Sequence, residues 1–79
     1  MKNSVTMDSG VKLFVGDMIV IDRSGMLTVG EIEEIDGDSD DCIGMTTGGW
    51  FGVSGVMNIG VWKILRKATE EDVANLPEY

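Results

Sequence analysis

Carboxylates are the side chains of this sequence that offer the most chemistry. Seven of the 14 acidic residues lie within residues 31–41, where Glu31 and Glu33 could pair on one strand face. A catalytic pair needs a cleft that keeps one carboxyl group protonated and excludes water, and a chain of 79 residues rarely encloses one. Histidine is absent, so Cys42 and the serines lack the base that would activate them. We therefore expect solvated carboxylates and no enzymatic activity.

The aspartates of the same segment raise a second chemistry, metal binding. Asp36, Asp38 and Asp40 alternate as the first ligands of a calcium loop do. Such a loop also needs Gly at its sixth position and Glu at its twelfth, where this chain has Asp41 and Thr47. We therefore predict a solvated hairpin loop, with no metal and no other cofactor.

A second candidate site begins in the polar and aromatic stretch at residues 46–51. Its hydroxyls, glycine N–H groups and aromatic rings could hold a phosphate and stack a base, with positive charge supplied from further along the chain. A Gly-Gly hairpin followed by core aromatics is the simpler interpretation, so a small-molecule site stays an alternative. Its residues would be Thr46, Thr47, Gly48, Gly49, Trp50, Lys63 and Arg66.

Short strands are expected to position these side chains. Residues 14–35 predict two antiparallel strands joined by a tight turn at residues 23–25. The step from Val29 to Ile32 breaks the two-residue alternation of a strand, and we place the bulge that this break requires at Gly30. A bulge bends its strand, which is how short strands close into a small barrel. Further strands are predicted at residues 11–14, 41–47, 50–57 and 59–67.

The end of the chain predicts a short helix. Thr69 fits the N-cap position, and the three acidic residues after it suit the positive end of the helix dipole. Pro77 stops the helix. Val73 and Leu76 share one face, so we expect this helix to close one end of the barrel.

Two groups of residues carry a resemblance to a known fold. The first is Phe14, Gly16, Asp17, Ile19 and Ile21, and the second, after a glycine turn, is Gly30, Ile32, Ile35, Gly37 and Asp38. This pattern is similar to the opening of SH3-like barrels of the KOW and Tudor type, and to short SH3-like proteins encoded by bacteriophages and prophages. Those proteins commonly finish with a basic strand and a capped helix, as residues 63–76 do here. The resemblance covers most of residues 12–76 and implies a mainly β fold, a small five-stranded SH3-like barrel with a short C-terminal helix.

The length of the chain predicts one domain in three parts. These are a flexible N-terminal segment at residues 1–10, the barrel at residues 11–67, and a capped helix and tail at residues 68–79. A domain near this size buries only about 60% of the surface of its unfolded chain, so the monomer should be marginally stable. The single Cys42 suits a reducing compartment, and residues 1–10 lack the apolar segment of a signal peptide. We therefore expect a cytoplasmic protein, in the host cytoplasm if a phage encodes it.

The charge of the chain limits its partners. A formal net charge of -8 disfavours direct binding to duplex nucleic acid, which needs clustered basic residues. The same charge favours a basic protein partner, or a head-to-tail contact with the basic residues at 63–67.

Residues 42–62 carry no charge, and Gly44, Gly48 and Gly52 repeat at the spacing of a membrane-helix contact. The glycines and polar residues of this segment favour paired strands, so we expect no membrane span.

Apolar residues occur on both faces of the predicted strands. If Ile19 and Ile21 point inward, Met18 and Val20 point outward. In the last strand, Trp62 likewise faces away from its apolar neighbours at residues 61 and 65. A tail of residues 66–79 could cover one such apolar patch but hardly two. We therefore predict a buried interface, most simply that of a homo-oligomer.

Together these features predict a non-enzymatic protein-interaction module, a self-associating accessory or inhibitor protein of the phage type, such as an anti-defence protein. It would bind a host protein through an acidic hairpin and an apolar face, and its carboxylates would replace phosphates at a basic nucleic-acid site. The expected interface residues are Met18, Val20, Glu31, Glu33, Glu34, Asp36, Asp38 and Trp62. Two alternatives stay open: an oligomeric protein that sequesters a nucleotide-like signal, and a structural component of a virion.

Overall fold

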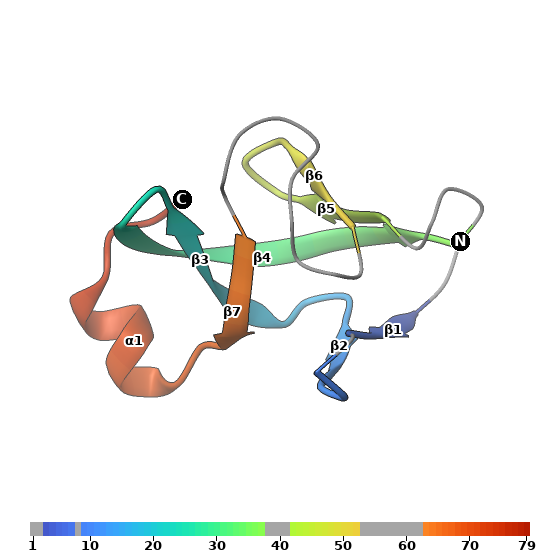
Figure 1. The fold of residues 1–79 in the computed structure, drawn as a ribbon, viewed down its shortest axis with the longest axis horizontal. Coiled ribbons are helices and arrows are strands. Elements are labelled where there is room, and N and C mark those ends of the chain that lie inside the picture. The colour runs from blue at the N-terminus through green and yellow to red at the C-terminus, as the bar shows by residue number, and fades with distance from the viewer. Residues whose placement is uncertain (1–2, 8, 38–41, 53–62) are drawn as a thin grey trace.

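The fold consists of two antiparallel sheets and one short helix (Figure 1). It is seen in a computed structural model that describes residues 3–7, 9–37, 42–52 and 63–79. The elements of these residues are β1 (Ser4–Thr6), β2 (Lys12–Phe14), β3 (Met18–Arg23), β4 (Met26–Asp36), β5 (Cys42–Met45), β6 (Trp50–Phe51), β7 (Lys63–Lys67) and α1 (Glu70–Asn75).

The larger sheet has five strands in the order β6-β5-β4-β3-β7, and every neighbouring pair is antiparallel. Figure 1 shows β4 running the length of this sheet, with β3 and β7 beside one part of it and β5 and β6 beside the other. The sheet curls into a barrel-like fold with a short C-terminal helix, which confirms the predicted fold class.

The hairpin of β3 and β4 turns through only two residues, Ser24 and Gly25. Both have positive φ, 58° and 100°, as a turn that matches the twist of its strands requires. The Asp22 carboxylate accepts a hydrogen bond of 2.7 Å from the N–H of Gly25 and so ties the turn. The tight turn predicted at residues 23–25 is therefore confirmed.

A bulge does bend β4, but not at Gly30. The pairing of β4 with β3 is regular through Gly30, whereas its pairing with β5 shifts between Ile32 and Glu34, which leaves Glu33 as the extra residue. The predicted position was wrong because Val29 and Ile32 face opposite sides of the sheet. The bulge instead returns Ile35 to the side of Ile32, and both side chains are fully buried.

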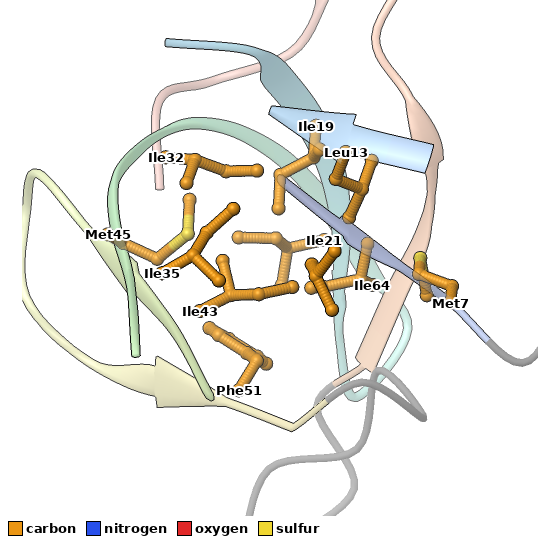
Figure 2. Close-up of a cluster of buried hydrophobic side chains, with 11 residues drawn as sticks. Met7, Leu13, Ile19, Ile21, Ile32, Ile35, Ile43, Met45, Phe51 and Ile64 are labelled. Carbon is orange, nitrogen blue, oxygen red and sulfur yellow. The ribbon is translucent and has the colours of Figure 1, made fainter. Parts of the chain in front are cut away.

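Most of the buried side chains form one cluster between the two sheets (Figure 2). Every strand of the described chain contributes to it, and Val11 and Tyr79 pack at its margin. The members are Val5, Met7, Leu13, Ile19, Ile21, Ile32, Ile35, Ile43, Met45, Phe51 and Ile64.

The N-terminal segment corrects an expectation. We expected residues 1–10 to be flexible, but Ser4–Thr6 form a strand that pairs with Lys12–Phe14. Val5 and Met7 are 6% and 7% exposed and belong to the buried cluster. A strand of three residues is too short to show a reliable alternation, so its pattern gave no warning.

The helix α1 begins as predicted. The N–H of Asp72 donates to the Thr69 hydroxyl at 3.1 Å, and the N–H of Thr69 donates to the Asp72 carboxylate at 3.0 Å, which completes a capping box. No residue of α1 is buried, and the Val73 side chain is 45% exposed. The expectation that α1 closes the barrel was therefore wrong, and Tyr79 packs against the core in its place.

Residues 77–79, the C-terminal tail, extend the sheet. The N–H of Val29 donates to the carbonyl of Pro77 at 2.9 Å, and the N–H of Tyr79 donates to the carbonyl of Val29 at 2.6 Å. Val29 pairs with Val20, and these two side chains are 3% and 0% exposed although they lie outside the core cluster. The chain thus covers Val20 by itself, so Val20 is withdrawn as an interface residue.

Candidate functional site

The carboxylates singled out from the sequence lie along one strand, β4. Glu31 and Glu33 are exposed, while Glu34 and Asp36 are half-buried. Strand alternation places Glu31 and Glu34 on the face away from the buried isoleucines, and the bulge adds Glu33 between them. We call Glu31, Glu33 and Glu34 the acidic ridge. Met18 lies opposite Glu31 and is half-buried. Asp38 and Trp62 lie outside the described residues.

Trp50 adds an aromatic surface to this ridge. Glu34 pairs with Gly44, and Gly44 pairs with Trp50, so the three residues form a row across β4, β5 and β6. A Cβ at Gly44 would lie 3.0 Å from two atoms of the indole and 3.2 Å from Cγ of Glu34. The indole therefore lies across the glycine, and the side chain of Glu34 borders the same space. Trp50 remains 45% exposed.

The row suits a cation. The face of an indole attracts ammonium and guanidinium groups, and ionised carboxylates form charge-assisted hydrogen bonds with the same groups. Among the residues that the structure describes, no ion pair engages Glu31, Glu33 or Glu34. The ridge therefore offers an aromatic face and carboxylates that are not neutralised by basic side chains of the described chain.

The small-molecule alternative is built on the turn between β5 and β6. Gly48 and Gly49 have positive φ, 97° and 95°, which agrees with the predicted hairpin. The N–H of Gly48 donates to the carbonyl of Met45 at 3.0 Å, and that of Thr46 donates to the carbonyl of Glu31 at 3.1 Å. Two of the N–H groups that would cradle a phosphate are thus used by the fold itself.

The basic residues of the small-molecule alternative lie on another strand. Lys63 and Arg66 belong to β7, and β6 and β7 form the two edges of the five-stranded sheet. The guanidinium of Arg66 is 3.0 Å from the carboxylate of Asp72 and holds α1 in place. These contacts give Arg66 a structural role in anchoring α1.

A third group of side chains was not expected from the sequence. The ring of Phe14 is 43% exposed, and the ammonium groups of Lys12 and Lys67 lie 5.5 and 5.4 Å from its centroid. We call Lys12, Phe14 and Lys67 the basic patch. Lys12 and Phe14 alternate on β2, which a sequence can show, but only the fold brings Lys67 of β7 beside them.

No family model, curated protein or solved structure matches this chain.

The described residues also bear on a metal site and on a membrane span. Within the described ranges, no group of three or more His, Cys, Asp or Glu side chains is placed to hold a metal ion. Asp38, Asp40 and Asp41 of the predicted aspartate loop lie outside those ranges. No helix in the described part of the chain has the length and apolar character to cross a bilayer. The described residues of the uncharged segment at 42–52 form β5, β6 and their turn.

Proposed function

We propose that this protein is a non-enzymatic interaction module that docks on a basic protein through the acidic ridge and Trp50. The observation that carries the proposal is the exposed indole of Trp50 beside Glu34. Glu34 and the other ridge carboxylates of β4 form no ion pair with a basic side chain of the described residues. Trp50 replaces Val20 as the apolar part of the expected interface, because Val20 is buried by the chain itself.

Arginine is the partner side chain that fits this surface best. Its planar guanidinium can stack on the indole while its N–H groups bind a carboxylate in a two-pronged contact. A stacked cation contributes about 0.5–1 kcal/mol at an exposed site and about 2 kcal/mol when water is excluded. Tryptophan and arginine are also the residues most enriched among those that dominate interface energies.

The charge of the whole chain supports the same partner. With a formal net charge of -8, the protein attracts a basic surface over a distance and speeds the encounter. A basic nucleic-acid site on a host protein has the matching charge, and the ridge carboxylates would occupy it in place of phosphates. Within this proposal, a phage-encoded inhibitor in the host cytoplasm is the biological setting.

The test is capture of partners from host lysate with the wild-type chain and three variants. The first variant reverses the ridge charges (Glu31→Lys, Glu33→Lys, Glu34→Lys), and the second is Trp50→Ala. The control reverses three exposed carboxylates elsewhere, Glu70, Glu71 and Glu78, and so changes the net charge equally. We expect a basic protein to bind the wild type and the control. Its binding should be lost both with the charge-reversal variant and with Trp50→Ala, and the protein should be released as salt rises.

Circular dichroism of each variant must first show that the fold is kept. The proposal is rejected if the captured proteins are the same for the ridge variants and the control. It is also rejected if the proteins that depend on the ridge are acidic.

A further inference from the structure

The basic patch is an unusual surface for a chain of this charge. Of the six Lys and Arg residues, Lys12 and Lys67 flank one exposed aromatic ring, and two more, Lys63 and Arg66, lie on the same strand as Lys67. Leu65 of that strand is 38% exposed, and Val15, next to Phe14, is 44% exposed. Positive charge and apolar surface therefore occur together at the β7 edge of the sheet.

The patch is held in place by the fold. The N–H of Phe14 donates to the Asp17 carboxylate at 2.8 Å, and the N–H of Asp17 donates to the carbonyl of Phe14 at 3.0 Å. The same carboxylate lies 3.3 Å from the ammonium of Lys67. The turn at residues 14–17 is bonded to β4, because the N–H of Gly16 donates to the carbonyl of Ile32 at 2.9 Å. Phe14 and the ammonium group of Lys67 are thus held in place before any partner arrives.

The chemistry of the patch defines what it can bind. Two ammonium groups beside an aromatic ring fit a segment that presents carboxylates next to an aromatic or apolar side chain. A long polyanion such as single-stranded nucleic acid would fit the patch itself, but it would be repelled by the remaining charge of a chain at -8. A protein surface with a few carboxylates does not meet this repulsion to the same degree.

The acidic ridge with Trp50 has this composition. We propose that the basic patch of one copy of the chain binds the acidic ridge of a second copy. Lys12 and Lys67 then face Glu31, Glu33 or Glu34, and the exposed rings of Phe14 and Trp50 supply the apolar part of the contact. Self-association thus rests on opposite charges and two exposed rings, not on the outer face of β3, where Val20 is already covered.

The inference uses the ridge of the proposed function, so the two contacts compete. The contact joins unlike surfaces, and every copy carries both of them. Two copies close into a symmetric dimer if they can make both contacts with each other at once, and otherwise the contact extends as a ring or a chain. A basic partner that occupies the ridge should dissociate the oligomer. A second copy therefore serves as a built-in competitor for the partner site.

Charge-swap complementation tests the contact. One variant carries Lys12→Glu and Lys67→Glu, and the other carries the three ridge reversals given above. Sedimentation velocity and native mass spectrometry are recorded over a range of concentrations, for each variant alone and for their mixture. We expect the wild type to self-associate, each variant alone to be monomeric, and the mixture to associate again. In the mixture the two reversed surfaces are complementary, and the intact ridge of the first variant also meets the intact basic patch of the second.

Phe14→Ala separates the contact from net charge. This change keeps the charge and removes a ring that is 43% exposed, so we expect the fold to be retained, which circular dichroism checks. We expect it to weaken self-association by about tenfold, whereas Val73→Ala, at a side chain that is 45% exposed on α1 and lies in neither surface, should leave it unchanged. A wild type that stays monomeric at its highest soluble concentration overturns the inference, and so does a mixture that stays monomeric.

The two proposals fail in different ways. Lys12→Glu with Lys67→Glu removes self-association but leaves the ridge intact, so capture of a basic partner should persist or increase. If that variant is monomeric and captures no partner, the self-association contact stands and the proposed function fails. If this variant captures a partner and the wild type is also monomeric, the proposed function stands and the self-association contact fails.

Discussion

The indole of Trp50 lies across the backbone of Gly44 and fills the space that a side chain at that position would need. Gly44 is consequently buried in the middle of a sheet although its neighbour on the edge strand is 45% exposed. The absence of a side chain at residue 44 is what lets the indole extend from β6 to Glu34 on β4. The geometry of the ridge therefore depends on one glycine that contacts no partner.

Gly44→Ala should displace the indole outward. The new Cβ would lie 3.0 Å from the ring, and the edge position of β6 lets the ring move rather than strain the backbone. We expect a stability change within about 1 kcal/mol, a red shift of Trp50 emission, and weaker binding of a basic partner. Emission is recorded in a Trp62→Phe background, which leaves Trp50 as the only tryptophan. An unchanged spectrum would show that the indole does not lie across residue 44.

Tyr79→Ala should destabilise the fold markedly for a residue so near the end of the chain. The ring packs against the buried cluster and meets Phe51 edge-on, with centroids 6.1 Å apart and planes at 67°. Losing this half-buried ring should cost about 2 kcal/mol of unfolding free energy. Thermal unfolding should shift down by about 10 °C. Glu78→Ala, an exposed neighbour, is the control and should shift the midpoint little; equal midpoints for the two variants would contradict the prediction.

The turn of the β3–β4 hairpin can be improved. Ser24 has a φ of 58°, a conformation that asparagine adopts more readily than serine. We expect Ser24→Asn to raise the unfolding free energy by about 0.5 kcal/mol, and Gly25→Ala, at a φ of 100°, to lower it by about 1 kcal/mol. Urea unfolding measures both. A decrease for Ser24→Asn would mean that the Ser24 hydroxyl stabilises the turn more than the backbone preference does.

The cap of α1 should make stability depend on pH. The backbone N–H of Thr69 and the guanidinium of Arg66 hold the pKa of Asp72 below its ordinary value. Because the folded pKa lies below the unfolded one, the contribution is present above the unfolded pKa and is lost as pH falls through the folded one. Wild type should therefore exceed Asp72→Asn in stability at neutral pH, and the difference should vanish once the pH has fallen through the lowered pKa of Asp72 and the carboxyl is protonated in both states. Glu71→Gln, which is exposed in the same turn, is the control; a difference that persists in acid would exclude this origin.

Features set by neighbouring residues were predictable from the sequence. The Ser24-Gly25 turn, the Gly48-Gly49 hairpin and the Thr69 cap each depend on a few consecutive residues whose backbone preferences act locally. The mainly β fold and the short helix followed from the same kind of signal. The expectation that Glu31 and Glu33 lie at the surface is confirmed, since both are exposed.

The errors concern contacts between residues far apart in the chain. Val20 looked like an exposed apolar residue because alternation shows which face it lies on but not that the chain covers that face. The bulge was misplaced for the same reason, since Val29 is buried by contacts outside the core cluster and bonded to the tail. The basic patch was missed because Lys67 reaches Phe14 only when β7 pairs with β3.

Glu33 has a consequence for the shape of the whole molecule. Without it, Ile32, Glu34, Ile35 and Asp36 would alternate as a regular strand, so this residue is not needed to direct any side chain inward. Its effect is curvature. One inserted residue bends β4, and the bend turns the paired strands β5 and β6 toward the buried isoleucines. Excising Glu33 would therefore straighten β4 and weaken the closure of the sheet around its core, even though every remaining residue kept its preferred side.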